Sequence, residues 1–99
     1  MEIKEISVAE AKEMIAKNKE NKHFLILDVR TPEEFAEEHL PNAVNIDIHE
    51  DDFQEKIDRL DRTKTYLVHC KSGGRSKAAV ELMLEMRFTR VYNVKGWMF

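Results

Sequence analysis

Apolar residues recur along the chain in two alternating patterns, one typical of strands and one typical of helices. Residues 3–6 alternate apolar and charged side chains, as a short edge strand does. From Val8 onward the apolar residues recur at helical spacing. Ser7 followed three residues later by Glu10 is typical of a capping box, so we predict a helix that begins at Val8 and ends near 17–19.

The second unit starts with an uninterrupted apolar run. Residues 24–27 suit a strand that is covered on both faces of a parallel sheet, and the run closes on Asp28. Thr31 suits the position that caps the first turn of a helix, and Pro32 suits the first helical position, where no N–H group is needed. The acidic residues that follow match the positive end of the helix dipole. We therefore expect a short helix that reaches about Glu38.

A third, shorter unit follows. Residues 43–46 are expected to form a short strand, and Asp51 or Asp52 is expected to cap the next helix. That helix should bury three apolar side chains, those of Phe53, Ile57 and Leu60.

The last part of the chain reads as strand, glycine loop, helix and strand. These elements are expected at 65–69, 70–76, 77–87 and 90–94, and the helix is apolar enough to be buried against a sheet. Strands that alternate with helices imply right-handed βαβ crossovers. The sequence therefore predicts an α/β fold with a mainly parallel central sheet and helices on both faces.

Composition narrows the function classes. The chain has 99 residues, one cysteine and a formal net charge of -3, with 42% apolar and 35% charged residues, which fits one compact globular domain over 1–99. A single cysteine excludes an internal disulfide and argues against a structural zinc site. Without a signal peptide or membrane span we expect a cytoplasmic protein, and the acidic balance argues against nucleic acid as a partner.

The loop after the 65–69 strand carries the candidate chemistry. In open α/β sheets, ligands bind beyond the carboxyl ends of the strands, and Cys70 lies at such an end just before a helix. Gly73 and Gly74 allow the backbone N–H groups to converge on an anion, and Lys71 and Arg75 add positive charge. We expect the pKa of Cys70 to fall below its ordinary value of about 8.5. The alternative is a small buried cysteine beside a plain turn, which this context makes the weaker interpretation.

The sequence resembles the single-domain rhodaneses, a family of sulfurtransferases, along nearly its whole length. Residues 70–75 (Cys-Lys-Ser-Gly-Gly-Arg) resemble the family's active-site loop, and residues 27–30 with 33–35 resemble its early strand and helix. Residues 39–46 are similar to its His-Ile-Pro-Gly-Ala segment, and residues 92–96 to its last strand and turn. Three separated motifs besides the loop, in the family's order, make the match specific.

Two departures from the family pattern are visible. Asn42 stands where the family usually has glycine, a mild change because asparagine also tolerates a positive φ. After Gly96 the family normally continues with a second glycine and a further helix, whereas this chain reads Trp97, Met98, Phe99, so we expect that helix to be missing.

The resemblance implies a two-step sulfur transfer. The Cys70 thiolate would attack the outer sulfur of a small anionic donor such as thiosulfate, release sulfite and hold a persulfide. Since the chain has no second cysteine, the sulfur must pass to an external acceptor, which is cyanide, a thiol or a protein. No cofactor is implied. Five residues of the loop are the candidate substrate contacts: Lys71, Ser72, Gly73, Gly74 and Arg75.

Two other functions are weighed against this one. Cysteine phosphatases and arsenate reductases also place a Cys and an Arg on an anion-binding loop, but they need five residues between the two, whereas four separate Cys70 from Arg75. The other alternative is a noncatalytic interaction module of the same fold, since fold alone does not fix function.

A few polar residues outside the loop invite a role. Asp28 and Arg30 flank the end of a buried strand, where they either support the loop or form an ordinary ion pair, and we favour the structural role. His69 should point away from the thiol because side chains alternate across a strand. His39 and His49 lack the spacing of metal ligands, so no metal is predicted.

Overall fold

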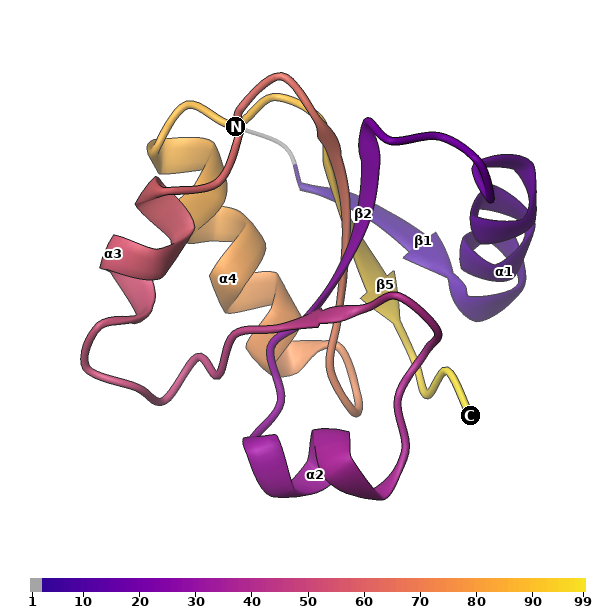
Figure 1. The fold of residues 1–99 in the computed structure, drawn as a ribbon, viewed down its shortest axis with the longest axis horizontal. Helices are drawn as coiled ribbons and strands as arrows, with labels where there is room; N and C mark the ends of the chain where they lie inside the picture. Colours follow the sequence, from indigo (N-terminus) through magenta and orange to yellow (C-terminus); the bar gives the residue numbers. More distant parts are fainter. Residues whose placement is uncertain (1–2) are drawn as a thin grey trace.

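The computed structural model describes residues 3–99 as a five-stranded sheet with helices around it (Figure 1). The elements in chain order are β1 (Lys4–Ser7), α1 (Val8–Lys17), β2 (Phe24–Asp28), α2 (Pro32–Glu37), β3 (Val44–Asn45), α3 (Phe53–Asp58), β4 (Thr65–His69), α4 (Gly74–Glu85) and β5 (Val91–Lys95). The strand order is β1-β5-β4-β2-β3, and every neighbouring pair is parallel. The predicted α/β class and parallel sheet are confirmed.

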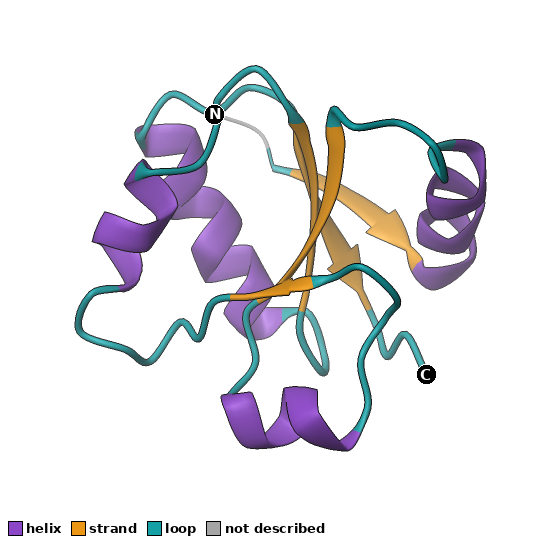
Figure 2. Cartoon of the chain, in the orientation of Figure 1, coloured by secondary structure: helices purple, strands orange, loops and turns teal. Residues whose placement is uncertain are grey.

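The helices form three groups around the sheet. In Figure 2, α1 covers one face, α3 and α4 cover the other, and α2 lies beyond the carboxyl end of the sheet. Each face has its own apolar cluster: Ile26 and Leu67 pack with Ala11 of α1, whereas Leu27 and Val68 pack with Val80 of α4. Neighbouring residues of a strand thus serve opposite faces, and Cys70 belongs to the α4 side.

Local sequence signals account for the helix starts. Ser7 and Glu10 form the predicted capping box at α1, and Thr31 and Glu34 form a second one at α2, with Pro32 in the first turn. Asp52 occupies the position before α3, but its side chain makes no capping hydrogen bond there, so the predicted cap is wrong. Its backbone, at φ -95° and ψ 16°, is not in the extended conformation from which such a side chain caps.

The largest boundary error concerns α4. The helix begins at Gly74 and not at 77, and it ends at Glu85 and not at 87. Gly73 has a φ of 103°, so the chain reverses there and enters the helix at once. As a result Arg75 and Ser76 lie in the first turn of α4 and not in a long loop. Asn42 adopts a φ of 66°, as its place in a glycine position predicted.

Burial at α3 follows the prediction in part. Phe53 and Ile57 are buried, whereas Leu60 follows the helix and is only partly buried. Across residues 3–99, no helix has the length and apolar character needed to span a membrane.

Candidate active site

Cys70 sits at the carboxyl end of β4 with its side chain held by the first turn of α4. The Sγ atom accepts hydrogen bonds from the N–H groups of Gly73 (3.2 Å) and Ser76 (3.3 Å), and the Ser76 Oγ lies 3.4 Å from it. The thiol is 1% exposed. A side chain at position 73 would approach the backbone of Val94 and Lys95 to 3.3 Å at an unfavourable φ, so this turn requires glycine.

The hydrogen bonds at Sγ favour the thiolate. Burial raises the pKa of Cys70. Hydrogen bonds from Ser76 and from the N–H groups of Gly73 and Ser72 lower it, and together they outweigh burial. The net direction is below the ordinary value, as the sequence predicted. No side-chain cation within residues 3–99 is among the causes of this lowering. Because the Ser76 hydroxyl directs its proton to the Asn93 Oδ1 atom, we assign the lowering to the backbone N–H groups of Gly73 and Ser76.

Arg75 forms an ion pair with a residue of α2. Its guanidinium forms two hydrogen bonds with the Glu34 carboxylate of α2, at 2.7 and 3.1 Å. This pairing, with help from Thr31, lowers the pKa of Glu34 to about 2. Arg75 therefore joins α4 to α2. Glu34 and, more weakly, the nearby Cys70 thiolate both stabilise the charged guanidinium and raise the pKa of Arg75.

The rest of the loop and the end of the chain surround the cysteine with exposed groups. Lys71 and Ser72 are exposed, and the Lys71 ammonium lies 5.9 Å from the centre of the Trp97 ring. Trp97 and Phe99 are 40% and 36% exposed and their rings stack edge to face. An ammonium and two aromatic rings thus lie close to the loop that holds Cys70.

Asp28 and Arg30 form a closed ion pair at the end of β2. Both side chains are buried, and the guanidinium donates three hydrogen bonds to the carboxylate at 2.7 to 3.0 Å. The Arg30 Nη2 also donates to the Glu38 carbonyl at 2.6 Å, and the guanidinium lies under the Trp97 and Phe99 rings. Within residues 3–99, no hydrogen bond of these two side chains reaches the loop after Cys70.

The histidines lie apart from the thiol. His69 is fully buried, with its Nε2 3.6 Å from an Asp28 carboxylate oxygen, and burial lowers its pKa. His39 Nδ1 contacts the Phe35 carbonyl and His49 Nδ1 contacts Asp47. In the described part of the chain, no cluster of three or more His, Cys, Asp or Glu side chains could hold a metal ion.

Three residues of the site were missed by sequence reasoning. Ser76 donates its hydroxyl proton toward Asn93 of β5, and Asn93 in turn donates to Gly73 and to Glu5 of β1. For Glu34 the sequence predicts only a place among the acidic residues in the first turn of a helix. An asparagine inside the apolar strand Val91–Lys95 was the available signal, because a polar side chain in a central strand is buried only with partners.

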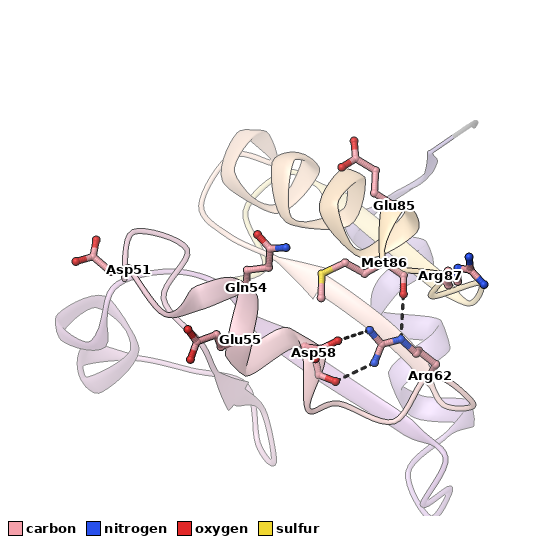
Figure 3. A pocket seen from close by; sticks show the side chains of 8 residues that line it. All are labelled: Asp51, Gln54, Glu55, Asp58, Arg62, Glu85, Met86 and Arg87. Carbon is pink, nitrogen blue, oxygen red and sulfur yellow. Dashed lines mark hydrogen bonds and ion pairs between the residues drawn. The ribbon is translucent and has the colours of Figure 1, made fainter.

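One cavity lies elsewhere and is not part of this site. It measures about 690 Å³ and lies between α3 and the end of α4, as Figure 3 shows. Arg62 spans it with hydrogen bonds to Asp58 and to the Met86 carbonyl (Figure 3). Arg62 thus connects the end of α3 to the segment that follows α4 in this groove.

Comparison with known proteins gives consistent matches. The family model described as "Rhodanese-like domain" matches residues 7–98. A putative sulfurtransferase, YtwF, from Bacillus subtilis is 43% identical over 98 residues, covering 99% of this chain and 89% of that protein. The thiosulfate sulfurtransferase GlpE of Coxiella burnetii is 32% identical over 97% of this chain and 84% of that protein.

The solved structures agree with these relatives. The crystal structure of a rhodanese-like domain protein from Staphylococcus aureus superimposes with a TM-score of 0.77 at 34% identity, covering 97% of this chain and 88% of that chain. Sequence and fold therefore point to the same group of proteins.

Proposed function

Because this chain belongs to the rhodanese-like family, we propose that it is a sulfurtransferase that carries sulfur as a persulfide on Cys70. The donor is a small anion with a sulfane sulfur, such as thiosulfate, and the acceptor is a thiophile: cyanide, a thiol or a protein. The observation that carries this proposal is the Cys70 Sγ, which accepts two backbone N–H bonds and has no cationic side chain bonded to it among residues 3–99.

In the first half-reaction the Cys70 thiolate attacks the outer sulfur of thiosulfate. A bond forms between Sγ and that sulfur, the S–S bond of the donor breaks, and its electron pair leaves with sulfite. Backbone N–H groups of the loop stabilise the negative charge at the sulfur, and the exposed Lys71 ammonium attracts the anionic donor.

In the second half-reaction the acceptor attacks the outer sulfur of the persulfide. The bond between Sγ and the outer sulfur breaks, and its electron pair returns to Sγ as the thiolate. Since Cys70 is the only cysteine, the acceptor is always an external group. We expect the reaction in a reducing, cytoplasmic compartment, because Cys70 must stay a thiol between turnovers.

Two features favour sulfur transfer over phosphate-ester hydrolysis. The four residues between Cys70 and Arg75 make a tight turn, in which donors converge on one sulfur atom. Glu34 holds both terminal nitrogens of Arg75, whereas a phosphatase needs its arginine free to bind the oxyanion.

The decisive experiment measures thiocyanate formed from thiosulfate and cyanide, beside hydrolysis of an aryl phosphate. We expect thiocyanate from the unchanged protein, none from Cys70→Ser, and normal rates from Thr89→Ala, which removes an exposed hydroxyl. Hydrolysis of the ester without thiocyanate would favour the phosphatase alternative. The absence of both activities would favour the noncatalytic module.

A further inference from the structure

Asn93 is a buried polar residue in the middle of the apolar strand β5, and its amide has only one orientation that satisfies its neighbours. The Nδ2 group lies 3.0 Å from a Glu5 carboxylate oxygen and 3.3 Å from the Gly73 carbonyl oxygen. Both neighbours are acceptors without hydrogens, so the NH₂ group must face them. The Oδ1 atom therefore faces the Ser76 hydroxyl, and as a pure acceptor it takes the single hydroxyl proton of Ser76.

This orientation fixes what Ser76 can offer to Cys70. With its proton directed to Asn93, the Ser76 Oγ presents only lone pairs to the Cys70 Sγ, 3.4 Å away. Lone pairs accept the S–H of the neutral thiol, but they repel a thiolate. To donate to the thiolate, Ser76 would have to leave the Asn93 Oδ1 buried without a partner, which is unfavourable.

The two parts of Ser76 thus act on Cys70 in opposite directions. Its backbone N–H donates to Sγ at 3.3 Å and favours the thiolate, whereas its hydroxyl is held as an acceptor and favours the thiol. A hydroxyl free to turn would instead donate to the charged sulfur and favour the thiolate. The state of the hydroxyl therefore depends on a residue that does not touch Cys70.

We propose that Asn93 is a positioning residue that keeps Ser76 as a hydrogen-bond acceptor toward Cys70, and so restrains the acidity of the reacting sulfur. A less acidic sulfur is a stronger nucleophile once ionised and a poorer leaving group when the persulfide is transferred. Asn93 therefore sets the balance between attack on the donor and release of sulfur to the acceptor. This consequence rests on the proposed function, but the hydrogen-bond arrangement itself does not.

The test is a pH titration of the Cys70 thiolate by its ultraviolet absorbance, which needs no sulfur donor and no access of a reagent to the buried thiol. Cys70 is the only cysteine, so the difference between this titration and the same titration of Cys70→Ser, which cancels the absorbance of the two tyrosines, belongs to one group. Other charged groups surround this region and stay unchanged in the key variant: Glu5 of β1, Asp28 of β2, His69 of β4, and Lys71 and Arg75 beside the cysteine.

The key variant is Ser76→Ala, which deletes the hydroxyl and keeps the backbone N–H. If Asn93 holds the hydroxyl as an acceptor, the thiol loses a partner and the titration midpoint moves to lower pH, with a several-fold larger thiolate fraction below the midpoint. If the hydroxyl donates to the thiolate, the midpoint moves to higher pH. A midpoint that rises or stays unchanged overturns the proposal. Thr89→Ala is the control for loss of a distant hydroxyl.

A second variant tests Asn93 itself. In Asn93→Ala the Ser76 hydroxyl is released to donate to the thiolate, so the midpoint also moves to lower pH. In the Asn93→Ala, Ser76→Ala double variant the midpoint should equal that of Ser76→Ala alone, because Asn93 acts through the hydroxyl. Additive shifts of the midpoint would contradict an effect of Asn93 through the Ser76 hydroxyl. If Asn93→Ala does not fold, the sign of the Ser76→Ala shift alone decides the proposal. Sulfur-transfer assays are scored separately, so a protein without transferase activity still gives a clear titration result.

Discussion

The carboxyl ends of β2 and β4 lie side by side, with Asp28 in register with His69. Each holds a buried acidic group, but the groups that stabilise the negative charge differ between the two strands. At β2 the Asp28 carboxylate is matched by the full positive charge of the Arg30 guanidinium. At β4 the Cys70 sulfur meets the backbone N–H groups of Gly73 and Ser76 and the Ser76 hydroxyl, and among residues 3–99 no cationic side chain is hydrogen-bonded to it.

The difference explains why one end is structural and the other is a candidate reaction centre. A full cation held by several hydrogen bonds neutralises its partner and makes it a weaker nucleophile. Backbone N–H groups carry partial charges, so they stabilise an anion at the sulfur while leaving it a nucleophile. The end of β2 therefore stabilises the fold, whereas the equally buried end of β4 holds the candidate nucleophile.

The largest effect should come from breaking the pair at β2. Arg30→Met leaves Asp28 buried without its cation, and we expect the free energy of unfolding to fall by about 3–5 kcal/mol in urea denaturation. The double variant Asp28→Leu, Arg30→Met removes both charges and should regain much of that stability. A loss of stability below about 1 kcal/mol in Arg30→Met would mean that the Asp28–Arg30 pair does not stabilise the fold as a buried ion pair.

The next effect should come from widening the turn at β4. One glycine inserted between Gly74 and Arg75 moves the Ser76 N–H away from Sγ, and loss of such a donor costs about 3 kcal/mol, so thiocyanate formation should fall about a hundredfold. A glycine inserted between Lys19 and Glu20, in an exposed turn, is the matched control and should leave the rate unchanged. Equal rates in both insertions would show that the loop donors are not needed.

The smallest effect concerns the ion pair that joins α2 to α4. Glu34 has a pKa of about 2, below its ordinary 4.5, because Arg75 favours the carboxylate. A lowered pKa stabilises the fold above pH 4.5, and this contribution is lost as the pH falls toward 2. Glu34→Gln should lower the free energy of unfolding by about 1 kcal/mol at neutral pH, since the pair is partly exposed.

Urea denaturation across pH checks this expectation. The difference in stability between the unchanged protein and Glu34→Gln should shrink between pH 4.5 and 2, whereas Glu33→Gln, an exposed neighbour, should show little difference at any pH. A difference that does not depend on pH would mean that the Arg75 partner does not act through the charge of Glu34.

Much of the fold was predictable from local patterns. The uninterrupted run 24–27 and the capping residues Ser7, Glu10 and Thr31 gave the elements and their parallel arrangement, because periodicity and capping are local properties. The start of α4 was not predictable in the same way. It depends on the φ of Gly73, a positive value that other residues rarely adopt, at a place where the backbone of β5 would lie 3.3 Å from a Cβ atom.

The site was predictable in its nucleophile and less so in its partners. Cys70 and the glycine turn stand together in the sequence, and their meaning comes from the strand and helix on either side. Glu34 reaches Arg75 from 41 residues away, and Asn93 reaches Ser76 from 17 residues away. Such contacts are set by the packing of separate elements, which no local pattern reports.

The most direct test of the central claim is mass spectrometry of the protein after incubation with thiosulfate. Our account predicts a species heavier by one sulfur atom, lost on addition of cyanide, and no such species in Cys70→Ser, because a hydroxyl at that position is not ionised at neutral pH. An unmodified mass in the unchanged protein, or the same added sulfur in Cys70→Ser, would contradict the claim that Cys70 carries the sulfur.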